Sequence, residues 1–393
     1  MPRTVAVDPQ PMEEDLGRLS RVAQGAPNDK SRQLMVYSLS LEKNNTMVLS
    51  GRKVLLVALT IVTAILPVKA EGLKFNLAFD GLFDNREFKG DVMPQTIYGM
   101  RLTPEIGIER GNHLIMGGVS KIWEFGSKGD IDPTPVLYYK FTQDKWSASF
   151  GNIPRTHLQR QLPDAFLYDS IAFFEPVIGG TLIQYYGSDL EVELYCNWFS
   201  RQRMYDREAF RIVNDLQYNL SFVSVGYYAA LTHFAGSIEP GHSLYEKFMF
   251  NPWIRFDFSE FMPANTVLKL EGGLLGSGIR CRTFPDWNKY FGFLGKIEAG
   301  WKWFNVQSTF YKGDCQQEFL HDPDAGIQFH RSDPFYNHTF YNKTRMGIQF
   351  YDDGNIAFGF NWNIHFTPDT PIHHQQMITV KYRFEPADFF KKR

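Results

Sequence analysis

The chain has 393 residues and is rich in aromatic side chains (35 Phe, 19 Tyr and 8 Trp), yet its mean hydropathy is only −0.30. Its 41 basic and 43 acidic residues give a formal net charge of −2, which argues against a nucleic-acid partner. It contains no apolar run near the length of about 20 residues that a membrane-spanning helix needs, which excludes a helical membrane protein.

One continuous apolar run, residues 54–66, follows two basic residues and precedes small residues that end at Ala70. A basic flank, an apolar segment of about 7–15 residues and a small-residue cleavage point are typical of a secretory signal peptide. We therefore expect residues 47–70 to be a signal peptide with Met47 as the true start. Residues 1–46 are polar and lack periodicity, so we expect a disordered leader or a mis-called start.

Alternation between apolar and polar side chains begins at residue 73 and recurs along the first half of the mature chain. Residues 73–80, 100–109 and 190–198 place large apolar side chains at nearly every second position, and Cys196 belongs to the apolar row of the third stretch. A period of two predicts β-strands with one apolar face and one polar face. The charged residues of interest on these polar rows are Arg101, Glu105, Glu191 and Glu193.

The second half repeats the pattern over residues 248–258, 267–275, 290–302 and 374–384, and most clearly over residues 355–366 (NIAFGFNWNIHF). Such a stretch has the length of about 9–11 tilted residues that crosses a bilayer, whereas a soluble strand averages about 5–6. Its small and amide side chains suit a wet interior, which is the inside-out pattern of a transmembrane barrel. The charged residues on the polar rows of this half are Arg255, Asp257, Lys269, Glu271, Lys296, Glu298, Lys381 and Arg383.

The connectors between the expected strands alternate in length. Long ones fall near residues 84–94, 126–135, 153–177, 201–208, 234–246, 276–289 and 314–339, with turns of a few residues between them. Outer-membrane barrels have short periplasmic turns and long extracellular loops, whereas a soluble sandwich has no reason to sort its connectors. The sequence therefore predicts an all-β, transmembrane, antiparallel up-and-down β-barrel over residues 71–384, with about 16 strands and 14 or 18 as alternatives.

With these features the chain resembles the porin-like outer-membrane β-barrel proteins of Gram-negative bacteria. Its aromatic-ended last strand (ITVKYRF) is similar to the signal read by the barrel-assembly machinery, although residues 385–393 follow Phe384 and are expected to be a C-terminal tail. The resemblance implies export to the bacterial outer membrane, contact with its lipid, and the assembly machinery as a partner during biogenesis. Self-association into a homo-oligomer is left open.

The third long connector, residues 153–177, is the candidate constriction. In porins the third loop folds into the lumen, so the resemblance nominates its polar residues as lining the constriction; the alternative is a loop packed over the barrel mouth. The charged residues on the polar rows either set a transverse field that tunes ion selectivity or brace the wall as a salt-bridge lattice. The nominated loop residues are Arg155, His157, Arg160, Asp164 and Asp169.

We expect a channel for passive diffusion of small hydrophilic solutes, without cofactor or metal. The alternative is a barrel-anchored surface receptor or adhesin that binds glycan or protein through aromatic loops at residues 284–287 and at Phe335 and Tyr336. We expect no enzymatic activity, because neither G-x-S-x-G nor H-E-x-x-H occurs and nothing fixes the geometry of His157 with Ser170.

Three further residues and two cysteines lie in outer connectors. His321, Asp322 and Asp324 could be drafted into a catalytic or Ca²⁺ site, but a loop with two carboxylates is usually just solvated. Cys281 and Cys315 would share the outer rim, where an oxidising exterior permits a disulfide. The sequence does not decide between a Cys281–Cys315 disulfide and two free thiols. The distance between the two Cα atoms is decisive, because Cα atoms more than about 7 Å apart cannot be joined without backbone movement.

Overall fold

The computed structural model describes residues 72–384 apart from 91, 240, 242, 319 and 321–325. All of these belong to the second of two compact units, Lys53–Arg393. The expected leader (1–46), signal peptide (47–70) and tail (385–393) lie outside the described residues.

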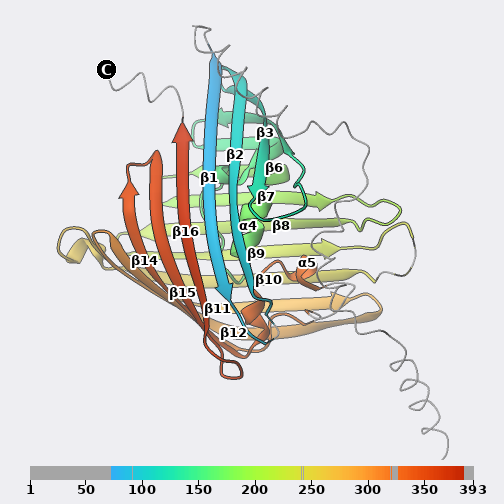
Figure 1. Cartoon of the computed structure of the whole chain (residues 1–393), viewed down its shortest axis with the longest axis vertical. Coiled ribbons are helices and arrows are strands. Elements are labelled where there is room, and N and C mark those ends of the chain that lie inside the picture. The colour runs from blue at the N-terminus through green and yellow to red at the C-terminus, as the bar shows by residue number, and fades with distance from the viewer. Residues whose placement is uncertain are drawn as a thin grey trace, which may run out of the picture. The chain divides into compact units, whose positions relative to one another are not determined.

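The described residues form sixteen strands that close into an antiparallel barrel, in which each strand pairs with its sequence neighbours and β1 also pairs with β16 (Figure 1). The predicted 16-stranded up-and-down barrel is confirmed. The strands are β1 Leu73–Glu87, β2 Gln95–Arg110, β3 His113–Glu124, β4 Thr134–Gln143, β5 Trp146–Pro154, β6 Val177–Tyr186, β7 Leu190–Ser200, β8 Ala209–Leu220, β9 Val223–Phe234, β10 Tyr245–Asp257, β11 Thr266–Cys281, β12 Phe284–Trp301, β13 Phe304–Gly313, β14 Phe340–Asp352, β15 Ile356–Phe366 and β16 His373–Phe384.

One end of the barrel carries tight turns and the other carries most of the long loops. At the turn end, Gly111 and Asp144 adopt positive φ angles of 57° and 52°, which lets two-residue connections reverse the chain. At the loop end, the short helices are η2 Arg155–His157, α4 Asp169–Phe174, α5 Gly326–His330 and η4 Pro334–Asn337, while η3 Ser259–Phe261 lies at the turn end. No helix in the described part of the chain is long and apolar enough to cross a membrane.

The predicted long connector at residues 276–289 is wrong. These residues belong to β11 and β12, which continue to a two-residue turn at Arg282 and Thr283. Gly276 and Gly278 break the apolar alternation in the sequence, but in the hairpin they leave room for aromatic rings of the neighbouring strand: a Cβ on Gly278 would lie 3.2 Å from the ring of Trp287. The glycines therefore extend the sheet instead of ending it.

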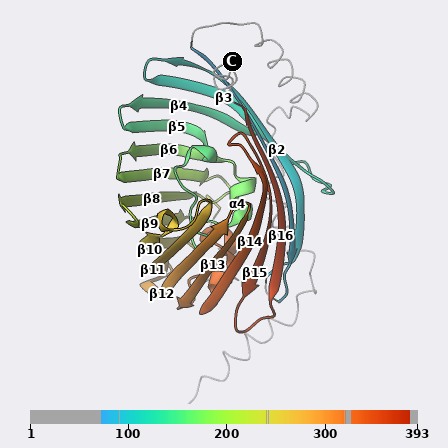
Figure 2. The same ribbon diagram turned by 90° about the vertical axis from the view of Figure 1, so that its left-hand side faces the viewer.

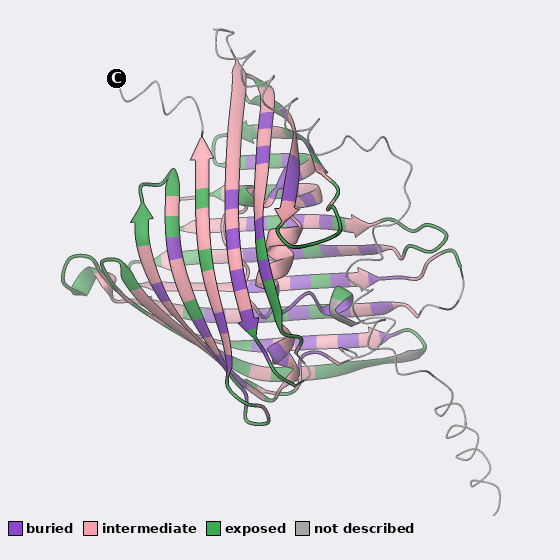
Figure 3. Cartoon of the chain, viewed as in Figure 1, coloured by how far each residue is buried: buried purple, intermediate pink, exposed green. Residues whose placement is uncertain are grey.

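Side chains alternate between the two faces of the wall, as the banding of buried and more exposed residues along β1 and β2 shows (Figure 3). On β15, Phe358, Trp362 and Phe366 are exposed on the outer face, whereas Asn363 and His365 are buried towards the lumen. Large apolar side chains exposed all around the outside are what a lipid-facing surface requires.

The lumen is not uniformly wet, contrary to the expectation from the small and amide side chains. Inward-facing aromatic residues of the wall pack with residues of the connectors in one buried apolar cluster. Phe166 lies 6.0 Å from the ring of Tyr228 on β9, and Phe335 stacks 5.2 Å from the ring of Tyr341 on β14. Burial of these rings stabilises connectors that have folded inward.

Candidate functional site

The third loop, residues 155–176, folds into the barrel, and α4 lies inside the ring of strands (Figure 2). Lys343 of β14 anchors it: Nζ lies 2.8 Å from a carboxylate oxygen of Asp164 and 3.2 Å from one of Asp169. Burial opposes ionisation of Asp169, but Lys343 and Arg345 together lower its pKa. The inward fold nominated by the resemblance is therefore the one observed, and the alternative of a loop packed over the mouth is not.

The same loop is anchored on the far side of the barrel by β7 and β8. Arg160 forms ion pairs with Glu191 and Asp215, and the backbone N–H of Gln159 donates to Glu193 at 2.8 Å. Burial acts against the charge of Arg160, but Asp215 and Glu191 raise its pKa. The loop thus crosses the lumen from one wall to the other.

The remaining nominated loop residues pack near its ends. Arg155 donates from Nε to the backbone oxygen of Glu175 at 2.6 Å, and burial lowers the pKa of Arg155. The ring of His157 lies edge-on to Tyr138 at 5.1 Å, and burial, with a contribution from Lys140, lowers the pKa of His157 to about 4. The Oγ of Ser170 instead accepts from Arg86 of β1, so the weighed pairing of His157 with Ser170 is not formed.

The seventh loop also enters the lumen, at its described residues 328–339, which the sequence did not predict. Its Asp333 N–H donates to the backbone oxygen of Asp164 at 2.9 Å, and its Arg331 forms an ion pair with Glu175. The third loop, residues 155–176, and residues 328–339 of the seventh loop are together called the loop plug. Phe335 and Tyr336 are buried inside it, so their assignment to a surface that binds external partners is wrong. The large aromatic rings of Phe335 and Tyr336, in a loop that would otherwise be solvated, were the sequence feature that could have indicated this inward fold.

A polar junction closes the plug against β14 and β15. Tyr341 donates to Asp333 at 3.0 Å and lies 2.7 Å from Nδ1 of His365, while Lys343 lies 3.9 Å from Asp333. Burial raises the pKa of Asp333 to about 6, although Lys343 acts in the opposite direction. Because these side chains are buried and bond to one another, the junction is built to hold the loops and not to admit a substrate.

The predicted strand charges face the lumen, mostly in pairs. Arg255 donates to Glu271 at 2.7 Å, Lys269 lies 3.5 Å from Asp257, and Lys296 lies 4.0 Å from Glu298. On β1, Asp80 accepts from Arg101 at 2.8 Å and also pairs with Arg383, while Lys381 lies opposite Asp80 in the strand register. The pairing matches a braced wall, and a role in ion selectivity stays a prediction.

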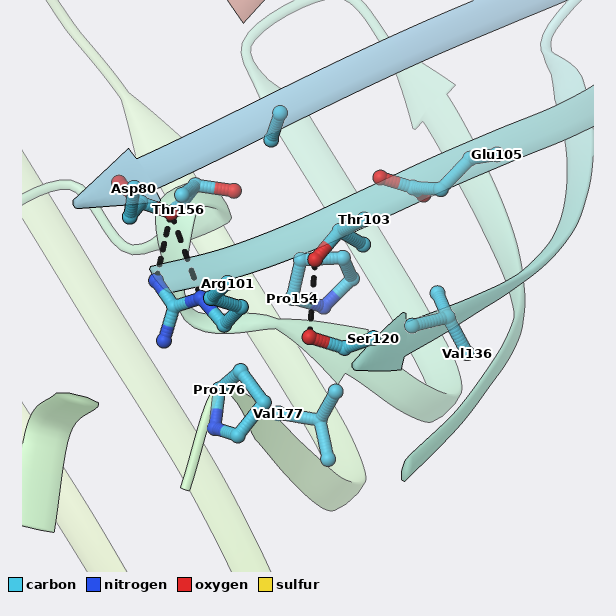
Figure 4. Close-up of a pocket in the computed structure, with 11 residues that line it drawn as sticks. Asp80, Arg101, Thr103, Glu105, Ser120, Val136, Pro154, Thr156, Pro176 and Val177 are labelled. Carbon is cyan, nitrogen blue, oxygen red and sulfur yellow. Dashed lines mark hydrogen bonds and ion pairs between the residues drawn. The ribbon is translucent and has the colours of Figure 1, made fainter. Parts of the chain in front are cut away.

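A small pocket lies in the lumen between β1–β3 and the base of the third loop (Figure 4). Its space is about 300 Å³, part of it open solvent, and Thr103 donates to Ser120 at 2.8 Å on its wall. The predicted residues Arg101 and Glu105 line it together with Asp80. Among the described residues, no group of three or more His, Cys, Asp or Glu side chains has an arrangement that could hold a metal ion. His321, Asp322 and Asp324 lie outside the described residues.

A second candidate site lies on the outer face, at the loop end of β7 to β11. The strand register sets one side chain of each strand directly beside the next: Trp198 opposite Phe210, Phe210 opposite His233, His233 opposite Glu246, and Glu246 opposite Arg280. These five residues are named the rim row below. Their immediate neighbours in sequence, such as Thr232 and Lys247, are buried towards the lumen, so the rim row itself faces outward.

Aromatic and charged contacts run continuously along the rim row. The ring of Phe210 stacks on Trp198 and on His233, with centroids 4.9 Å apart in both cases. His233 Nδ1 lies 3.6 Å from Glu246, which accepts from Arg280 Nε at 2.9 Å. Arg282, at the tip of the hairpin, lies 3.4 Å from the same carboxylate, and the guanidinium of Arg280 lies 4.7 Å from the ring centroid of Trp287.

Sequence reasoning missed the rim row, although a signal was present. His233 continues the apolar row that contains Leu231, and Glu246 continues the row that begins at Phe248. A charged or titratable group at the end of a lipid-facing row is unusual, because such positions at the membrane boundary normally carry aromatic residues. Only the strand register shows that the neighbouring strands β9, β10 and β11 each carry such a group, namely His233, Glu246 and Arg280.

Comparison with known proteins identifies a family. A family model described as Lipid A 3'-O-deacylase-type matches residues 65–387, and no curated protein matches the sequence. Among solved structures the chain is similar to OprD of Pseudomonas aeruginosa, at 9% identity and a TM-score of 0.48 over 81% of this chain and 96% of that one. It is also similar to OprB of Pseudomonas putida, at 7% identity and a TM-score of 0.48 over 85% of this chain and 96% of that one. A loop-deletion mutant of OmpT of Vibrio cholerae gives 8% identity and a TM-score of 0.48 over 79% and 99%. OprD and OmpT are described as outer-membrane proteins.

The family match overturns the prediction that the chain is not an enzyme, since the family is named for a deacylase. The absence of G-x-S-x-G and H-E-x-x-H excluded only sites carried by one short segment. A barrel can bring side chains of neighbouring strands together, as the register does for His233, Glu246 and Arg280. Such a constellation leaves no local motif.

Proposed function

The chain belongs to the Lipid A 3'-O-deacylase-type family, and from this premise we propose that it hydrolyses an ester-linked acyl chain of a lipid A-type glycolipid in the outer leaflet of the outer membrane. The observation that carries the proposal is the outward-facing contact of His233 with Glu246 beside Arg280. The lipid would reach this site from the bilayer without entering the lumen.

His233 is the general base of the proposed reaction. With Nδ1 turned to Glu246, Nε2 takes a proton from a water molecule whose oxygen attacks the ester carbonyl carbon. Arg280 stabilises the negative charge that develops on the carbonyl oxygen. When the ester C–O bond breaks, the proton passes from His233 to the leaving sugar oxygen, which yields a fatty acid and a free hydroxyl group.

Glu246 acts as a positioning residue. The distance of 3.6 Å to His233 is longer than a hydrogen bond, but contacts of this kind are often long before substrate binds. A carboxylate on Nδ1 fixes the orientation of the ring and stabilises the imidazolium formed during proton transfer. We expect Glu246→Gln to lower kcat while leaving KM nearly unchanged.

The outer face adjacent to the rim row suits acyl chains. Leu231 and Phe248 lie two residues from His233 and Glu246 on the same face, and both are exposed. Large apolar side chains at this level offer the acyl tail the contacts it has in the membrane. A substrate can therefore keep its chains in the bilayer while its ester groups meet the rim row.

The test is deacylation of purified lipid A by the full chain refolded in phospholipid vesicles, with the released fatty acid measured by mass spectrometry. His233→Gln is expected to lower kcat by roughly 10²- to 10⁴-fold, the usual contribution of a general base. His113→Gln is the matched control, because His113 lies at the turn end and contacts Tyr139 at 2.8 Å. Wild-type turnover in His233→Gln would contradict the proposal.

A second function, passive diffusion of small hydrophilic solutes, is favoured by the charged residues that line the lumen towards the turn end. Arg255, Glu271, Lys296 and Glu298 remain partly exposed to solvent there. The measurement is single-channel conductance of the refolded chain in a planar bilayer. Open events with ion selectivity would support the channel, and silence over a range of voltages would contradict it.

A further inference from the structure

We propose that the two arginines of the β11–β12 hairpin form a phosphate subsite on the outer face, which selects phosphorylated glycolipids. The inference rests on the proposed function for the kind of lipid, but it concerns binding and has its own readout. Arg280 and Arg282 both approach Glu246, so two guanidinium groups share one carboxylate. The hairpin therefore carries an excess positive charge beside the lipid-facing surface.

The geometry leaves the excess charge accessible. The side chain of Arg282 is 58% exposed, and its contact with Glu246 at 3.4 Å is long for a hydrogen bond. Lys289 is also exposed, and the register sets it opposite Gly278 on the outer face of β11. A guanidinium presents its N–H groups as a planar fork, which matches the oxygens of a phosphate.

The hairpin tip is held in place before any ligand binds. The backbone N–H of Arg282 donates to the carbonyl oxygen of Leu244 in the preceding loop at 2.8 Å. The Arg280 guanidinium is fixed between Glu246 and the ring of Trp287. A rigid, positively charged tip loses little conformational freedom when it binds an anion.

A headgroup phosphate fits this position better than a soluble anion. The rim row stacks aromatic rings beside the charges, and such rings mark the membrane boundary where lipid headgroups lie. A phosphorylated glycolipid would place its acyl chains on the exposed Leu231 and Phe248 and its phosphate on Arg282. Inorganic phosphate has no part that uses the apolar surface.

The experiment measures binding of lipid A to the full-length His233→Gln protein in detergent by native mass spectrometry, so that the lipid is not consumed. Bisphosphorylated lipid A is compared with the enzymatically dephosphorylated lipid. Arg282→Gln is expected to weaken binding of the phosphorylated lipid at least tenfold and to leave binding of the dephosphorylated lipid unchanged. Arg110→Gln is the matched control, because Arg110 is exposed at the turn end of β2.

Several outcomes would overturn the subsite. The subsite is refuted if Arg282→Gln, made in the His233→Gln protein, binds the phosphorylated lipid as tightly as the His233→Gln protein does. It is also refuted if the His233→Gln protein binds both lipids with equal affinity. Binding of inorganic phosphate as tight as that of the lipid would also refute it, since the lipid would then not be the ligand. Arg280→Gln provides a second variant, and heat-modified gel migration verifies that each barrel is folded. If His233→Gln retains full turnover while Arg282→Gln loses selective binding, the catalytic proposal fails and the subsite stands.

Discussion

Replacing Lys343 by methionine is expected to release the loop plug while the barrel wall stays folded. Lys343 is the buried cation shared by Asp164, Asp169 and Asp333, with Nζ 2.8, 3.2 and 3.9 Å from their carboxylate oxygens. Methionine is close to lysine in length, so the change removes the charge without leaving a large cavity. The sixteen-stranded hydrogen-bond network does not depend on this side chain.

The expected cost is about 3 kcal/mol, the lower end of the roughly 3–5 kcal/mol that follows removal of one partner of a buried ion pair. The lower end applies because Asp169 keeps Arg345 at 3.8 Å and Asp333 keeps the hydroxyl of Tyr341 at 3.0 Å. With about 1.4 kcal/mol for each factor of ten, the population with an open plug should rise roughly a hundredfold.

Limited trypsin digestion of the refolded protein measures this population, because cleavage follows the open fraction when opening and closing are fast. Arg160 and Arg331 supply cleavage sites within the plug, and peptide mapping identifies them. Lys296→Met is the matched control: its ion pair with Glu298 at 4.0 Å is 28% exposed on the lysine side and should contribute little. Cleavage of Lys343→Met at the wild-type rate, with folding verified by gel migration, would refute the anchoring argument.

Three other outcomes concern acid sensitivity, lipid contact and the cysteines. Burial lowers the pKa of His157 to about 4, so His157 binds a proton more tightly when the third loop is released than when it is packed. The contribution of the neutral ring to loop packing is therefore complete above pH 6.5 and is lost as the pH falls towards 4. Hydrogen exchange of the third loop should speed up over this pH range in wild type, and less so in His157→Gln. Cys196 lies on the outer face, two residues from the rim-row residue Trp198. Cys196→Arg should therefore lower the free energy of unfolding in vesicles by about 1–2 kcal/mol relative to Cys196→Ser. Equal stabilities of the two variants would contradict the outward placement. Cys281 and Cys315 are free thiols, so alkylation of the unfolded, unreduced protein should modify both, and a linked peptide would contradict this.

The strands of the barrel could be predicted because each carries its own evidence. In residues 355–366, apolar and polar side chains alternate, so the sequence alone shows which side chains face the lipid and which face the lumen. No contact with another segment is needed to recognise this pattern. The weighed disulfide shows where this local evidence ends. Cys281 is buried on the inner face near Phe329, while the thiol of Cys315 donates to Asn337 at 2.9 Å, and the bridge is not formed.

The interior of the barrel could be predicted only in part, because packing in the lumen is decided by distant segments. The resemblance offered an inward third loop as one of two alternatives, and the contacts of Lys343 with Asp164 and Asp169 are what place the loop inside. The seventh loop enters because Phe335 and Tyr336 find rings on β13 and β14, with centroids 5.2 Å from Phe335 to Tyr341 and 5.5 Å from Tyr336 to Tyr311. Packing between rings of segments far apart in the chain produces no periodic pattern in the sequence of either segment, so the sequence could not predict it.

Access from the bilayer favours the rim row over the plugged part of the lumen as the place of the proposed chemistry. The lumen holds more titratable groups, but those near the plug are satisfied by one another: the side chains of Lys343 and Asp333 are 4% and 0% exposed. A substrate could reach them only by displacing the loops that they hold. At the rim row, Glu246 is shared by His233, Arg280 and Arg282, and the exposed Arg282 extends this charge towards solvent. A lipid that diffuses in the outer leaflet would meet the rim row without any loop moving, so deacylation should persist in Lys343→Met, where the plug is open, and in wild type, where it is closed.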